Sequence, residues 1–111
     1  MNPAFWAALR SLAAGKITVD RPRGSRHPRF PHVVYPLDYG YVEDTSSMDG
    51  GGIDVWRGSG EGLTGIVVTV DLMKRDSEIK ILIGCTPEEV MTVLEFHNDS
   101  DCMKGIFIPA E

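Results

Sequence analysis

Residues 35–56 read YPLDYGYVEDTSSMDGGGIDVW, and the rest of the chain is organised around this stretch. It holds three tyrosines and five carboxylates, at Asp38, Glu43, Asp44, Asp49 and Asp54. Three glycines lead into an Ile-Asp-Val-Trp strand pattern, and such glycines suit a turn or a close approach of the backbone to a ligand. Asp49 and Asp54 are thus able to face a common centre, and Mg²⁺ prefers such oxygen ligands. The same spacing fits a solvated Asp-Gly turn that leads into an ordinary strand.

The composition indicates one domain that spans residues 1–111. Hydrophobic residues make up 42% of the chain, which is enough for a modest core, and the net charge of −5 disfavours a protein that coats nucleic acid. Cys85 and Cys102 have no metal-ligand spacing relative to the histidines, so reduced thiols in the cytoplasm are the favoured interpretation. No apolar run approaches the length of a membrane span.

Short strands with turn signals between them predict a mostly β fold of the α+β class. We expect a small, OB-like antiparallel β-barrel of about five or six strands, with an N-terminal helix and one C-terminal helix. The predicted helices cover residues 3–14 and 86–98. The predicted strands cover residues 17–20, 33–35, 39–42, 52–56, 65–72, 79–83 and 106–108.

Three features of this pattern leave alternatives open. Trp6 in the first helix is able to pack on the body of the protein or on a partner chain. In the second case the protein would be a homo-oligomer. His97 near the end of the last helix fits a packing role better than a ligand role. The loop RPRGSRHPRFPH at residues 21–32 carries four arginines, which suits contact with RNA or, more economically, with the acidic stretch that follows it.

The charged residues outside the opening stretch favour a site for phosphate. Asp71, Asp76 and Glu78 lie on a predicted hairpin that is able to fold back beside Asp49 and Asp54. Arg29 and Lys80 supply cations, and Tyr35 and Tyr39 supply phenol hydroxyls. Carboxylates that hold a divalent metal, together with arginine and lysine, are the groups that phosphate chemistry needs. Each group alone also fits a solvated turn or a lysine whose stem lies along a strand.

At these residues the sequence resembles the soluble, metal-dependent inorganic pyrophosphatases. Their hallmark is a tyrosine-rich strand followed by D-G-D-P-x-D-x, and here residues 35–41 (YPLDYGY) are followed by residues 49–55 (DGGGIDV). Val19-Asp20-x-Pro22 resembles a family strand with an acidic residue, and Arg29 falls where the family has a substrate-binding lysine. Asp71 and Lys80 match an aspartate and a lysine further along, and Asp76 or Glu78 stands for another acidic ligand. The resemblance covers roughly residues 17–83.

The sequence departs from the family pattern at several positions. The middle aspartate of the hallmark, which activates the attacking water in the family, is Gly51 here, and the following proline is Gly52. Pro31 replaces a second upstream acidic residue. A hairpin that carries a substrate arginine is missing, and the C-terminal tyrosine-lysine pair has no equivalent. Arg21, Arg23 or Arg26 would have to replace a lost cation.

The resemblance implies a cytoplasmic hydrolase of phosphate metabolism, an inorganic diphosphatase that uses Mg²⁺ (Mn²⁺ as an alternative) to split pyrophosphate. It implies catalytic roles for Asp54, Tyr39 and Asp71, and substrate binding by Arg29, Lys80 and Tyr35. It implies metal binding by Asp49, Asp54, Asp71, Asp20 and Glu78. The alternative is a non-catalytic module of the same fold that binds another phosphorylated ligand or a protein; neither membrane nor nucleic acid is an expected partner.

Overall fold

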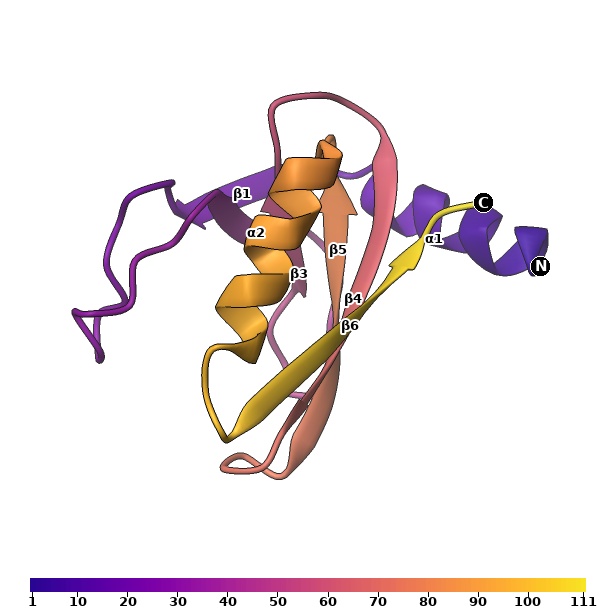
Figure 1. Cartoon of the computed structure of the whole chain (residues 1–111). Helices are drawn as coiled ribbons and strands as arrows, with labels where there is room; N and C mark the ends of the chain where they lie inside the picture. The colour runs from indigo at the N-terminus through magenta and orange to yellow at the C-terminus, as the bar shows by residue number, and fades with distance from the viewer.

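The computed structural model describes the whole chain, residues 1–111, as a six-stranded mixed sheet with one helix against each face (Figure 1). The helices are α1 (Pro3–Ala13) and α2 (Pro87–Asn98). The strands are β1 (Ile17–Arg21), β2 (Asp38–Val42), β3 (Ile53–Arg57), β4 (Leu63–Asp71), β5 (Asp76–Ile83) and β6 (Met103–Pro109). Neither helix has the length and apolar character needed to span a bilayer.

Both helices begin at side-chain caps that the local sequence encodes. The side chain of Asn2 accepts a hydrogen bond from the backbone N–H of Phe5 at 3.1 Å, and a proline follows the cap. In α2, Thr86 Oγ1 accepts from the N–H of Glu89 at 3.2 Å, and Glu89 Oε1 accepts from the N–H of Thr86 at 2.9 Å. This reciprocal pair confirms the predicted capping box.

The prediction of a mostly β, α+β fold is confirmed, but the prediction of a closed antiparallel barrel is wrong. The strand order is β1-β2-β3-β5-β4-β6, so β1 and β6 form the two edges and do not pair with each other. The pair β3–β5 is parallel, and every other pair is antiparallel. β5 lies between β3 and β4, and β4 in turn pairs with β6. Because the edge strands β1 and β6 do not meet, the sheet stays open, and it needs a helix on each face.

The predicted strand at residues 33–35 is also absent. This segment belongs to the arginine loop, defined here as residues 22–34, which projects from the body of the protein (Figure 1). Its two sides are linked by an isolated bridge between Arg26 and Val34 and by a few backbone hydrogen bonds, which do not extend into a strand. The prolines at positions 22, 28, 31 and 36 remove backbone donors that a strand ladder would need.

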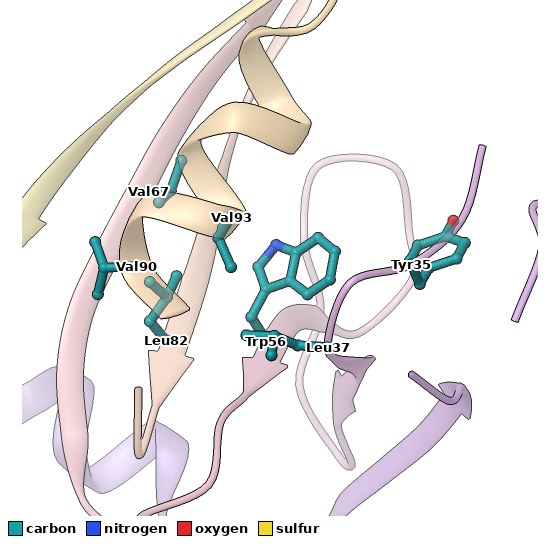
Figure 2. Close-up of a cluster of buried hydrophobic side chains, with 7 residues drawn as sticks. All are labelled: Tyr35, Leu37, Trp56, Val67, Leu82, Val90 and Val93. Carbon is teal, nitrogen blue, oxygen red and sulfur yellow. The ribbon is translucent and has the colours of Figure 1, made fainter. Parts of the chain in front are cut away.

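Alternation along the strands sends side chains to two separate cores, one on each face of the sheet. On the face under α2, Trp56 is fully buried between Leu82, Val93 and the aromatic ring of Tyr35 (Figure 2). On the face under α1, the helix buries Trp6 and Leu9 against a second group of side chains, namely Val42, Val55, Ile66 and Ile81. Trp6 thus packs on the body of its own chain.

Candidate functional site

Lys80 on β5 is the centre of a polar cluster on the α2 face. Its ammonium donates hydrogen bonds to Asp54 Oδ2 and Glu78 Oε2, both at 2.6 Å, and to the phenol oxygen of Tyr39 at 2.9 Å. All three N–H donors of the lysine are therefore in use. We call these four residues the Lys80 cluster.

Strand pairing explains why these four side chains meet. Val55 pairs with Ile81 in the parallel ladder, so Asp54 and Lys80, one position earlier on each strand, lie beside each other. Glu78 precedes Lys80 by two residues and points to the same face, because side chains alternate along a strand. Tyr39 pairs with Trp56 on β3, which aims its phenol at the same region.

The cluster is largely removed from water and carries a net negative charge. Lys80 is 7% exposed, while the side chains of Asp54 and Glu78 are 27% and 13% exposed. Burial alone lowers the pKa of Lys80, but its contacts with Tyr39, Asp54 and Glu78 outweigh burial and raise that pKa, so the ammonium stays charged. Burial raises the pKa of the Tyr39 phenol, which stays protonated and able to donate. One cation faces two carboxylates, and this leaves one negative charge uncompensated.

Asp54 and Glu78 are the two carboxylates of the cluster that could hold a metal ion. Asp54 and Glu78 each place a carboxylate oxygen 2.6 Å from the same cation, the Lys80 ammonium. No three histidine, cysteine, aspartate or glutamate side chains are grouped so that they could hold a metal ion by themselves. Mg²⁺ commonly binds through one or two carboxylates and takes its other ligands from water and substrate phosphate. Magnesium binding by Asp54 and Glu78 stays a prediction.

Asp49 lies in the glycine turn and stabilises that turn. Its Oδ1 accepts hydrogen bonds from the Ser47 hydroxyl at 2.7 Å and from the Gly51 N–H at 2.9 Å, and these bonds lower the pKa of the Asp49 carboxyl. The positive charges of Lys74 and Lys80 lower the same pKa further. Asp49 is thus exposed and engaged in its own turn, within the electrostatic field of the cluster lysine.

Asp71 and Asp20 lie outside the Lys80 cluster. Asp71 ends β4 opposite Asp76, and its Oδ1 accepts from the N–H groups of Met73 and Lys74 at 2.9 and 3.1 Å. These contacts match the turn role that the hairpin sequence also allows. Asp20 is exposed on the edge strand β1, at the point where its pairing with β2 shifts register. Metal binding by Asp20, Asp49 and Asp71 stays a prediction.

The end of β1 and the arginine loop bring several positive charges together beside the aromatic part of the α2 face. Arg21 donates to the phenol oxygen of Tyr35 at 2.7 Å, and its guanidinium lies 5.5 Å from the centre of that ring. The ring of Tyr35 stacks on His27, with 10° between the ring planes. Burial lowers the pKa of His27, as do the charges of Arg21, Arg29 and Lys74. Arg29 itself is exposed at this positive region.

The contact of Lys80 with both carboxylates differs from the sequence-based prediction, in which Lys80 binds phosphate while Asp54 and Glu78 bind metal as separate groups. The Glu-x-Lys spacing in a strand was the available signal, because it puts Glu78 and Lys80 on one face. His97 is confirmed as a packing residue, since it is 4% exposed and its Nε2 accepts a hydrogen bond from Trp56 Nε1 at 2.9 Å.

Comparison of the sequence with protein-family models gave no match, and comparison with curated proteins gave none either. The resemblance to the pyrophosphatases therefore rests on the motif residues described above.

Proposed function

We propose that this chain is a short, divergent relative of the soluble inorganic pyrophosphatases that binds pyrophosphate together with Mg²⁺ and hydrolyses it slowly. The observation that carries the proposal is the convergence of Asp54 and Glu78 on the buried Lys80 ammonium, with the Tyr39 hydroxyl beside it. The four groups lie on one face of the sheet and come from three strands. Two free cysteines, Cys85 and Cys102, agree with a cytoplasmic location.

In this proposal the two carboxylates and the single cation of the cluster have different partners. Asp54 and Glu78 hold the magnesium ion. Lys80 then no longer has to neutralise them, and its ammonium is free to bind a phosphate oxygen. The protonated phenol of Tyr39 donates to the same phosphate group, and Arg29 supplies a second cation from the exposed loop. The bound magnesium ion would supply charge neutralisation and a more acidic water molecule.

The rate is expected to be low because a carboxylate is missing at Gly51. General-base assistance is worth about 10²–10⁴-fold, and no side chain is available at this position to provide it. The same substitution favours a second candidate function, a non-catalytic module that binds pyrophosphate or another small phosphorylated ligand. The grouping of only two carboxylates at the Lys80 cluster also suits binding without turnover.

Phosphate release from pyrophosphate, measured with and without Mg²⁺, tests the hydrolytic function. Asp54→Asn should abolish release, because it removes a carboxylate that faces the cation. Asp38→Asn is a matched control, since Asp38 accepts a hydrogen bond from the Arg23 N–H outside the cluster and an amide oxygen can still accept it. Purification of all three proteins in parallel controls for a contaminating pyrophosphatase. Equal release by the wild type and Asp54→Asn would refute hydrolysis at this site.

A further inference from the structure

Arg21, the last residue of β1, lies next to the Lys80 cluster because of an irregularity in its strand. Regular pairing of β1 with β2 beyond Val19 would put Asp20 opposite Tyr39. The register shifts between Val19 and Arg21, so Arg21 takes that position instead. Paired residues of an antiparallel ladder point to the same face of the sheet, and their side chains are neighbours. The shift therefore places a guanidinium, and not a carboxylate, beside the phenol of Tyr39.

Tyr35 holds this guanidinium in one orientation. Nη1 of Arg21 donates a hydrogen bond to the Tyr35 phenol oxygen at 2.7 Å, and the guanidinium carbon lies 5.5 Å from the centre of the ring. The ring is itself fixed, because Tyr35 is 5% exposed and packs on Tyr39 and Trp56, whose ring centres are 5.5 and 6.0 Å away. An arginine that is oriented before a ligand arrives loses less conformational entropy on binding.

The rest of the Arg21 guanidinium has no partner within the chain. Arginine has five N–H donors, and the bond to Tyr35 uses one of them. No carboxylate lies within ion-pair distance of Arg21, since the ion pairs of the protein involve Lys16, Lys80 and the N-terminal amine. Every buried side-chain nitrogen has a hydrogen-bond partner, so the unbonded nitrogens of Arg21 are open to solvent. An oriented, half-buried cation without an anion of its own is available to an anionic ligand.

Arg23 and Arg26, in the arginine loop, lack this arrangement. Both are exposed, and Nη1 of Arg26 donates to the Pro31 carbonyl within the loop at 2.9 Å. Asp38 accepts from the backbone N–H of Arg23 and not from its side chain. Among the arginines, Arg21 alone lies over an aromatic ring. Because all three carry the same charge in the same part of the chain, they separate a specific contact from a general electrostatic attraction.

We propose that Arg21 is a phosphate-binding residue beside the Lys80 cluster and that Tyr35 is its positioning residue. In the order of the strands, Tyr39 on β2 lies between Arg21 on β1 and Lys80 on β5. Pyrophosphate carries two phosphate groups, so one is able to contact Lys80 while the other contacts the planar N–H donors of Arg21. The assignment rests on the proposed function and adds an oriented cation to it, whereas Arg29 is exposed.

Isothermal titration calorimetry tests the assignment with Mg²⁺ and a nitrogen-bridged pyrophosphate analogue, which resists hydrolysis. Arg21→Ala should weaken binding of the analogue about tenfold or more, the loss typical of one hydrogen bond to a charged group. Arg23→Ala and Arg26→Ala are matched controls that remove the same charge, and each should weaken binding by less than about twofold because salt screens exposed charges. Arg21→Met, which keeps an apolar stem, is a second variant in case alanine disturbs the edge strand.

Tyr35→Phe separates the positioning role from a structural one. This variant keeps the buried ring and removes the oxygen that accepts from Arg21. It should weaken binding of the analogue severalfold by itself. In protein that already carries Arg21→Ala it should have no further effect, because the hydroxyl acts through the arginine. Additive losses from the two substitutions would show that Tyr35 does not position Arg21.

The outcomes distinguish this assignment from the proposed function. If the folded wild type does not bind the analogue, both fail. If the wild type binds, and the folded Arg21→Ala and Arg21→Met variants bind as tightly as the two controls, Arg21 is not a phosphate contact while the proposed function stands. Comparable losses in Arg21→Ala, Arg23→Ala and Arg26→Ala would also overturn the assignment, because they indicate a general attraction. Circular dichroism establishes that each variant is folded.

Discussion

Acidification should destabilise the fold through His97. The indole N–H of Trp56 is only a donor, so Nε2 of His97 must be an unprotonated acceptor at 2.9 Å. The ring proton therefore lies on Nδ1, which faces the Met103 sulfur at 3.3 Å. A second proton on Nε2 would face the indole N–H directly. Protonation thus breaks a buried hydrogen bond and introduces an unpaired buried charge.

The size of this loss of stability follows from the pKa of His97. Burial, with a contribution from the Lys80 charge, lowers the pKa of His97 from 6.5 to about 4. Between pH 6.5 and pH 4, His97 therefore binds a proton in the unfolded chain but not in the folded protein. The contribution of neutral His97 to the free energy of unfolding is complete above pH 6.5 and is lost as the pH falls towards 4. A difference of about 2.5 pKa units corresponds to about 3 kcal/mol, a substantial part of the 5–15 kcal/mol that stabilises a typical domain.

Urea denaturation of the wild type and of His97→Gln, at intervals from pH 7 to pH 4, measures this effect. Glutamine can accept from Trp56 but does not titrate, so the variant should lose less stability on acidification by about 3 kcal/mol. Carboxylates that titrate in both proteins cancel in this difference. Parallel pH profiles for the two proteins would refute the assignment of a neutral, buried His97. Direct titration of the imidazole by NMR would give the same answer if the variant folds poorly.

Three further predictions concern the glycine turn, the arginine loop and the cap of α2. Gly51→Asp should raise pyrophosphate hydrolysis, because it supplies a carboxylate as general base. The backbone should tolerate it, since Gly51 does not have a positive φ and an added Cβ would meet only Asp49 Oδ1, at 3.3 Å. An unchanged rate in a folded variant would exclude a base at this position. Arg29→Ala should weaken pyrophosphate binding severalfold while Arg29→Lys retains most of it, as calorimetry can measure. Comparable losses of RNA binding on alanine substitution of Arg21, Arg23, Arg26 and Arg29 would instead support the RNA interpretation. Thr86→Ala should lower the free energy of unfolding by about 1 kcal/mol in urea denaturation, because the Glu89 N–H loses its acceptor; no change would argue against the capping box.

The elements that the sequence predicted well are those that local chemistry specifies. The cap at Thr86 defines the start of α2, and the strand predicted from Gly65 to Leu72 matches β4 within two residues at each end. The hairpin that joins β4 to β5 follows from the charged turn between them. Each of these signals lies within about ten residues of the structure that it encodes.

Strand order was not accessible in the same way. The parallel pairing of β3 with β5 crosses the whole of β4, and no local pattern distinguishes it from continued antiparallel pairing. This one pairing decides between the open sheet and the predicted barrel. The candidate site was also beyond local sequence patterns, because it depends on strand pairing. Alternation predicts that Glu78 and Lys80 share a face, but the contact of Lys80 with Asp54 depends on the β3–β5 register.

Binding of pyrophosphate to the Lys80 cluster is the central claim, and isothermal titration calorimetry with a nitrogen-bridged pyrophosphate analogue tests it most directly. The analogue resists hydrolysis, so the measurement applies equally to an enzyme and to a binding module. We expect binding in the presence of Mg²⁺, little binding when either component is alone, loss of binding in Asp54→Asn and retention in Asp38→Asn. Absence of binding to the folded wild type in the presence of millimolar Mg²⁺ would contradict the account.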